Sequence, residues 1–165
     1  MNKSNVWILH DSKYGNGKML SETLAKVLEE HGKQVQIGHV NDIDPNEVAT
    51  NPPELLIMGG AIRMFFMSRA PKNWFKKLVK ELERSNKTIP HMGVFVTHAR
   101  AKSSIDNYGK RLLNYYNSTK GIKIGKIYDT WLSGKVKEME GPFEDDVIDR
   151  ATTFAHELIT WSHSE

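Results

Sequence analysis

The sequence predicts a three-layer α/β domain in which helices cover both faces of a five-stranded parallel sheet. Short apolar or alternating runs are separated by longer segments with helical periodicity, so strands and helices alternate along the chain. Parallel neighbouring strands need helical crossovers, which place helices on both faces of the sheet. With 165 residues and no low-complexity stretch, we expect a single domain spanning residues 1–165.

The N-terminal half opens with a short apolar run, Val6–Leu9, which is typical of a strand covered on both faces. Apolar residues between 20 and 28 recur at helical spacing, and Gly32 is placed to end that helix. The alternating run 34–40 predicts a second strand near the sheet edge. A short helical turn at 44–49 follows, and a third strand, 55–58, ends at Gly59-Gly60.

The C-terminal half continues the alternation. Pro71 suits a first helical turn, and an apolar face follows it at 74–82. A fourth strand is expected at 91–97, a helix at 105–116, and a fifth strand at 122–128, with an extension through Trp131 left open. The last helix is expected after Gly141-Pro142, where acidic residues 144–146 suit a helix N-terminus.

Composition restricts the chemistry. The chain has no cysteine, which excludes disulfides, thiolate metal sites and a cysteine nucleophile. No apolar stretch approaches the ~20 residues that a membrane-spanning helix needs. We therefore expect a cytoplasmic protein without a membrane span. The seven histidines show no compact ligand spacing, and no metal site is expected.

Ligands of open parallel sheets bind outside the carboxyl ends of the strands, here the loops 11–17, 59–70 and 97–104. The first loop, within "DSKYGNGK", leads from a buried strand into a helix. Backbone N–H groups and the helix dipole favour a phosphate there, to which Ser12 could add a hydroxyl and Asn16 an amide. The loop lacks G-x-x-x-x-G-K-[ST] and G-x-G-x-x-G, and a plain turn is the alternative.

This segment resembles the phosphate loop of flavodoxins and related FMN proteins, with the pattern S/T-x-T-G-N-T or D-S-x-Y-G-N-T. The element order resembles their fold over nearly the whole chain. The resemblance implies the strand order 2-1-3-4-5, FMN as cofactor, and phosphate contacts from Ser12, Lys13, Tyr14, Gly15, Asn16 and Gly17. Gly17 departs from the pattern, because a residue with a hydroxyl group usually stands there.

The resemblance also implies which loops hold the flavin ring. Ala61, Ile62, Arg63 and Met64 are expected on one side of the ring, and Thr97, His98, Ala99 and Arg100 on the other. Residues 65–67 are apolar and would pack on the ring, cap the core or form a subunit contact. The cations among these residues would stabilise a negative reduced flavin, so we expect a higher potential than that of a typical flavodoxin.

Three functions follow from these observations. The first is an FMN-binding redox protein that transfers electrons between partners. The second is an FMN-dependent dehydrogenase or quinone reductase, because Gly60–Arg63 and Trp74–Lys77 resemble FMN-dependent protoporphyrinogen dehydrogenases. The long basic insertion of those enzymes is not evident at 133–138. The third is an interaction domain that has lost the cofactor, with Gly17 as the main indication.

Other classes fit poorly. Asp11 alone and Met58-Gly59-Gly60 do not supply the acids of a response regulator, and no G-x-S-x-G elbow is present. Residues 98–126 carry seven Lys or Arg against Asp106, yet their tyrosines fit helix packing as well as nucleic-acid binding. We expect a redox partner protein with an acidic face or a small-molecule electron acceptor, and no nucleic acid. The oligomeric state is not predicted.

Overall fold

Five long parallel strands form the central sheet of the computed structural model, which describes residues 5–63, 66–99, 102–138 and 140–164. Across the sheet they follow the order β2-β1-β3-β5-β6, so the predicted 2-1-3-4-5 order of the five parallel strands is confirmed. Their bounds are β1 (Asn5–His10), β2 (Gln34–His39), β3 (Leu55–Arg63), β5 (Ile89–His98) and β6 (Ile124–Lys135).

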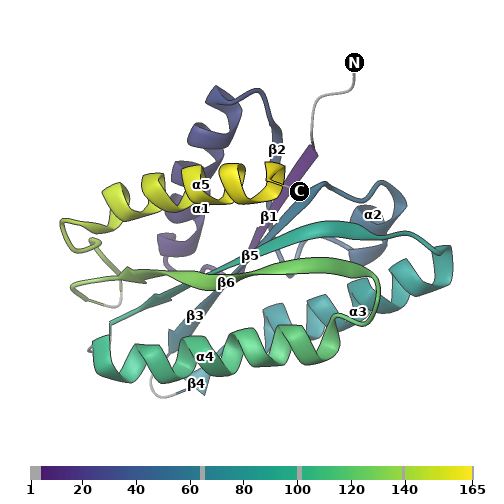
Figure 1. Cartoon of the computed structure of the whole chain (residues 1–165). Helices are drawn as coiled ribbons and strands as arrows, with labels where there is room; N and C mark the ends of the chain where they lie inside the picture. Colours follow the sequence, from purple (N-terminus) through teal and green to yellow (C-terminus); the bar gives the residue numbers. More distant parts are fainter. Residues whose placement is uncertain (1–4, 64–65, 100–101, 139, 165) are drawn as a thin grey trace.

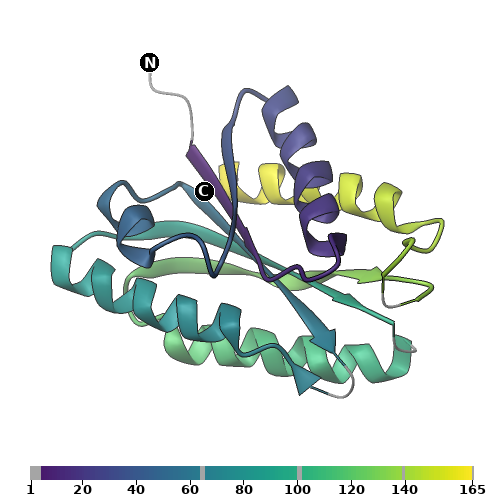
Figure 2. The same ribbon diagram turned by 180° about the vertical axis from the view of Figure 1, so that it is seen from behind.

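Helices cover both faces of this sheet, as Figures 1 and 2 show from opposite sides. One apolar core lies between the sheet and the helices α1 and α5, with Leu24 and Phe154 among its members. The other lies beneath α2, α3 and α4, where Phe75 and Tyr116 pack edge to face. The helix bounds are α1 (Asn16–Glu30), α2 (Pro45–Thr50), α3 (Ala70–Ser85), α4 (Lys102–Thr119) and α5 (Val147–His163).

Local sequence explains where several helices begin and end. Gly32, with a φ of 81°, follows α1 in the left-handed conformation that glycine tolerates best. The Asp44 carboxylate accepts a hydrogen bond from the Asn46 N–H at 2.9 Å and caps α2, which starts at Pro45. The caps predicted from glycine, proline and acidic residues therefore lie close to the observed helix ends.

The predicted end of the third strand at Gly59-Gly60 was wrong. Strand β3 continues to Arg63 and pairs with a short antiparallel strand, β4 (Phe66–Met67), so the expected loop 59–70 is largely a hairpin. A Cβ atom at Gly59 would overlap the ring of Phe95 on the neighbouring strand. The glycine makes room for that ring in the core and does not mark a turn.

The last two strands are also longer than predicted. Strand β5 runs from Ile89 to His98 where 91–97 was expected. Strand β6 runs from Ile124 to Lys135, so the expected end at residue 128 was wrong, and the strand continues even beyond the extension through Trp131 that was left open. At Gly134, a Cβ atom would lie 3.0 Å from the Leu20 Cδ2 atom of α1. A side chain there would press against Leu20 because α1 packs closely on the strand, and the glycine again lies inside a strand.

The reversal of strand order positions the candidate site. From β1 the chain passes to β2 on one side and later to β3 on the other, so the loops that follow β1 and β3 diverge at this point. Ligands of open α/β sheets bind in the crevice at such a reversal. Among the helices of the described ranges, none is both long and apolar enough to span a bilayer.

Candidate functional site

The loop between β1 and α1 makes a sharp turn that directs the start of α1 toward the carboxyl edge of the sheet. Gly15 is left-handed, with a φ of 93°, and a Cβ atom there would meet nothing within 4 Å. The Ser12 hydroxyl oxygen accepts a hydrogen bond from the Gly15 N–H at 2.9 Å. Ser12 therefore holds the turn, and its own O–H hydrogen is directed elsewhere, where it can serve a ligand.

The N-terminus of α1 has the electrostatic character of an anion site. The N-cap residue is Gly15, which has no side chain that could cap the helix, and no acidic residue lies in the first turn. Lys18 adds a positive charge in that turn. The backbone N–H groups of this turn and the helix dipole together favour a negative group such as a phosphate.

Gly17 has a packing reason for departing from the expected pattern. A Cβ atom at this buried position would lie 3.3 Å from Ser12 Cβ and 3.5 Å from His10 Cβ. The helix thus approaches its own loop more closely than most side chains allow. The space that a threonine would occupy is already lined by His10 and Ser12, and phosphate contacts at this position would come from the backbone.

His10 holds the loop through a hydrogen bond from the Ser12 backbone. Its Nδ1 atom accepts a hydrogen bond from the Ser12 N–H at 3.1 Å, and its ring packs edge to face on His39 at a centroid distance of 5.3 Å. Burial lowers the pKa of His10 from its ordinary value, and the nearby His39 lowers it further. The neutral ring is the form that can accept the Ser12 hydrogen bond.

Arg63 joins the end of β3 to the opening loop. Its Nη2 donates to the Asp11 carbonyl oxygen at 2.6 Å, and its Nη1 lies 3.2 Å from the Asp11 Oδ2. The Asp11 side chain is only 5% exposed, whereas that of Arg63 is 35% exposed. The pair therefore holds a partly exposed cation at the carboxyl edge, between two of the loops expected to bind the flavin.

The remaining residues expected at the flavin ring differ in how far they are exposed. Ile62 is buried in the core, and Ala61 is partly exposed on β3. Thr97 and His98 are buried on β5, and the His98 Nε2 lies 2.6 Å from the Ser133 hydroxyl of β6. Ala99 is exposed at the end of that strand, whereas Met64 and Arg100 lie outside the described residues.

The structure thus brings the residues 12–17, Arg63 and the end of β5 to one edge of the sheet. Three features of this edge were not predicted: the Arg63–Asp11 ion pair, the hydrogen bond from the Ser12 N–H to His10, and the close contact of the loop before α5 with Asn16. A Cβ atom at Gly141, where φ is 101°, would lie 3.1 Å from the Asn16 Oδ1. An acid directly after the first strand was the sequence signal for the ion pair.

The buried ring of His98 changes the role expected of it. Sequence reasoning placed its positive charge beside the flavin, but its side chain is 3% exposed and is held against β6 by Ser133. Its backbone can still border a ligand. Within the described residues, no group of three His, Cys, Asp or Glu side chains is arranged to hold a metal ion.

Comparison with known proteins finds solved structures with a similar fold but no matching family. No protein-family model matches the sequence, and a search of the curated proteins found no match. Several solved structures are similar throughout the chain. Rubredoxin:oxygen oxidoreductase from Desulfovibrio gigas matches 97% of it with a TM-score of 0.72 at 15% identity. The chain spans 37% of the length of that oxidoreductase.

Two smaller proteins match along nearly their whole length. Flavodoxin 1 from Bacillus cereus has a TM-score of 0.70 at 14% identity, and 98% of this chain covers 100% of it. The WrbA-like flavodoxin from Agrobacterium tumefaciens has a TM-score of 0.67 at 13% identity, and 97% of this chain covers 98% of it. The chain therefore has the flavodoxin-like fold, as expected.

Proposed function

We propose that this chain binds FMN non-covalently at the carboxyl edge of its sheet and transfers electrons between partners. The observation that supports this most strongly is the opening loop: a left-handed Gly15 as the N-cap, the Ser12 hydroxyl bonded to the Gly15 N–H, and the N-terminus of α1 behind them. This donor set fits a phosphate group. The flavodoxin-like fold of the neighbours supports the same choice.

The residues of the edge would bind and orient the cofactor. Residues Ser12 to Gly17 would hold the phosphate, mainly through backbone N–H groups. Ala61, Ile62, Arg63 and Met64 would border one side of the ring, and Thr97, His98, Ala99 and Arg100 the other. When bound, the isoalloxazine ring would supply the redox chemistry, and the chain would tune it electrostatically.

Flavin titration of the purified protein tests the proposal. We expect a bound-flavin absorption spectrum and quenched flavin fluorescence with FMN, and an affinity for riboflavin at least about 100-fold weaker, because riboflavin lacks the phosphate. Ser12→Ala should weaken FMN binding and leave riboflavin binding unchanged. Lys26→Ala, at an exposed position of α1 that lies well beyond its first turn, is the matched control. Equal affinities for the two flavins would contradict the phosphate site.

Arg63 also bears on the potential of the bound cofactor. A partly exposed cation at this edge would stabilise a negatively charged reduced ring and raise the potential above that of typical flavodoxins. Its pairing with Asp11 reduces this effect but does not remove it, because the guanidinium remains at the surface. Arg63→Gln should therefore lower the measured potential, and a wild-type potential as low as those carriers show would refute this part of the proposal.

Two assays separate the carrier from the alternatives. Rapid electron exchange with a flavodoxin reductase, without turnover of quinones or porphyrinogens, would support a carrier. Turnover of such a substrate without a protein partner would favour the FMN-dependent dehydrogenase. A chain that binds neither flavin would match the interaction domain that has lost its cofactor.

A further inference from the structure

A second recess lies beyond the flavin edge, between the β3–β4 hairpin and the helices α3 and α4. It is an open groove of about 650 Å³ whose apolar surface comes from Phe66, Met67, Tyr108 and Leu112. Phe66 is 76% exposed, although it is a large aromatic side chain. An exposed apolar surface of this kind beside polar residues commonly marks an interaction site.

Three cations border the groove: Arg69, Lys72 and Arg111. The Lys72 Nζ lies 5.0 Å from the centroid of the Tyr115 ring, and the Arg111 guanidinium carbon lies 5.9 Å from that of Tyr108. Burial lowers the pKa of Lys72, and the neighbouring Arg69 lowers it further. None of the residues described as lining the groove is acidic. The three positive charges would therefore favour an anionic group.

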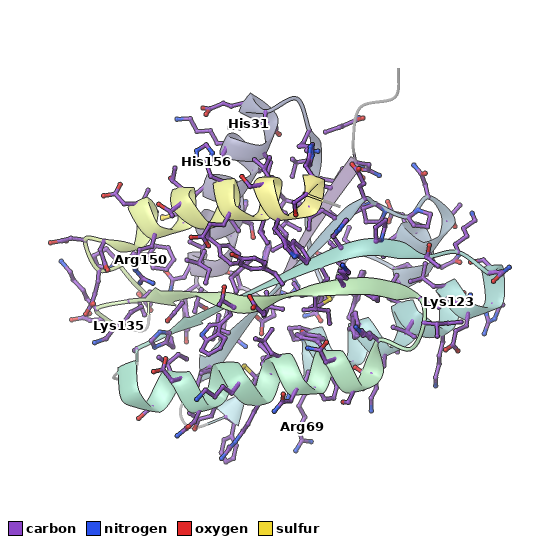
Figure 3. All side chains as sticks on the ribbon, viewed as in Figure 1. His31, Arg69, Lys123, Lys135, Arg150 and His156 are labelled. Atoms are coloured by element: carbon purple, nitrogen blue, oxygen red, sulfur yellow. The ribbon has the colours of Figure 1, made fainter. Side chains whose placement is uncertain are left out.

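The charge of the two helices beside the groove, α3 and α4, agrees with that of the groove. Helices α3 and α4 together carry eight Lys or Arg against three Asp or Glu, whereas α1 and α5 carry three against five. Figure 3 shows Arg69 on the α3–α4 side of the sheet, pointing away from it. A layer dominated by one sign of charge attracts an oppositely charged partner and orients its approach.

We propose that this groove is the docking site for an acidic segment of a redox partner protein, which inserts an apolar side chain beside Phe66. The redox character of the partner rests on the proposed function. The groove is continuous with the expected flavin edge, because Phe66 pairs directly with Arg63 in the hairpin. A second copy of the chain fits less well, since a symmetric contact would bring two basic layers together.

Peptide binding to the full chain, with and without FMN, tests the docking site. The probe is a fluorescently labelled peptide of Glu and Asp with one central Trp, followed by fluorescence anisotropy. Matched peptides carry Lys at each acidic position, or Ala in place of Trp. We expect the acidic Trp peptide to bind at least about tenfold more tightly than either, and its affinity to fall steeply as salt screens the charges.

Substitutions in the chain test which of its residues contact the peptide. Arg111→Glu should weaken binding of the acidic Trp peptide at least about tenfold, and Phe66→Ala should remove its advantage over the Ala peptide. Lys80→Glu places the same charge reversal at an exposed position of α3 outside the groove and should change affinity less than about twofold. FMN affinity should be the same in Arg111→Glu, Lys80→Glu and the wild type.

The outcomes separate the two proposals. Peptide binding that depends on Arg111 and Phe66 in a chain that fails to bind FMN would refute the redox function but not an acidic docking segment. FMN binding without preference for the acidic Trp peptide, or equal losses in Lys80→Glu and Arg111→Glu, would overturn the docking site. Self-association in sedimentation experiments that Arg111→Glu abolishes would assign the groove to a second copy and overturn it as well.

Discussion

At the scale of single residues, the contact between Arg63 and Asp11 ties the end of β3 to the loop that follows β1. The Arg63 guanidinium donates hydrogen bonds to the Asp11 carbonyl oxygen and to the nearly buried Asp11 carboxylate. Removing Arg63 would leave that carboxylate without this partner, and a buried charge is costly when its partner is lost. The pair therefore links the two loops expected to hold the phosphate and the ring.

We predict that Arg63→Ala lowers the free energy of unfolding by about 1–3 kcal/mol, because two hydrogen bonds to a buried group are lost. Arg84→Ala is the control, since Arg84 pairs with Glu81 within α3 and its side chain is 76% exposed. It should cost less than about 0.5 kcal/mol. Urea denaturation measures both, and equal costs would show that the Asp11 contact adds nothing to stability.

His10 gives the loop a predictable response to pH. Its neutral ring accepts the Ser12 N–H, and the groups that act on its charge are His39 and Lys18, which oppose it, and Asp11 and Asp42, which favour it. Burial dominates, so the folded pKa lies below that of the unfolded chain, which is about 6.5. As pH falls below that value, the unfolded chain binds more protons than the folded one, and this residue lowers stability.

We therefore predict that part of the loss of stability between pH 7.5 and pH 5 disappears in His10→Asn. Asparagine can present its carbonyl oxygen near the position of Nδ1 and accept the Ser12 hydrogen bond without titrating. His156→Asn, at an exposed position on α5, is the matched control. Urea denaturation across this pH range tests the idea, and an unchanged pH profile in His10→Asn would contradict it.

At the scale of elements, one glycine determines how closely α4 packs on the sheet. A Cβ atom at Gly109 would overlap the indole of Trp131 on β6. Alanine is the better helix former by about 1 kcal/mol, so helix propensity and packing oppose each other at this position. Packing should prevail, because the ring belongs to the strand and is partly buried against the core.

We predict that Gly109→Ala destabilises the fold by about 1–3 kcal/mol, measured by urea denaturation. In a Trp131→Leu background, where the ring is gone, the same substitution should be neutral or stabilising. Lys110→Ala, at the next and exposed position, should have little effect in either background. A similar loss from Gly109→Ala with and without Trp131 would rule out the proposed overlap.

Glycines also explain which elements the sequence could not predict. The periodic helices, the buried strand before the first loop and the order of the parallel strands were all expected correctly. Gly59 was interpreted as the end of a strand, and Gly134 was expected beyond the fifth strand, but each lies inside a strand and faces a large side chain, Phe95 or Leu20. A glycine that makes room for a distant residue looks the same in sequence as one that permits a turn.

The candidate site was predictable to a similar degree. Residues 12–17 lie at the expected loop because a local pattern specifies that turn. The burial of His98 depends on its contact with Ser133, which lies far along the chain on another strand. The hairpin pairing of Arg63 with Phe66 is local, but β4 has only 2 residues, too few to show an alternating pattern. No local periodicity therefore reveals either contact.

At the scale of the whole molecule, the sheet separates two helical layers of opposite net charge, and the candidate flavin edge lies between them. The central strands β1, β3 and β5 are buried for most of their length, whereas the edge strand β2 alternates between exposed and partly buried residues. The β1 and β3 ends that carry the loop 11–15 and Arg63 thus belong to the best-protected part of the fold.

We predict that amide hydrogen exchange is slowest in β1, β3 and β5 and faster in β2, because exchange from buried central strands requires larger opening. Adding FMN should slow exchange at the amides of residues 16–18, whose N–H groups would bind the phosphate, more than riboflavin does. The amides at the C-terminal end of α3, which lies just before the start of β5 and therefore at the opposite edge of the sheet, provide the internal control. Protection by FMN that is strongest at the end of α3, or equal protection by riboflavin at residues 16–18, would mean that the start of α1 does not hold the phosphate.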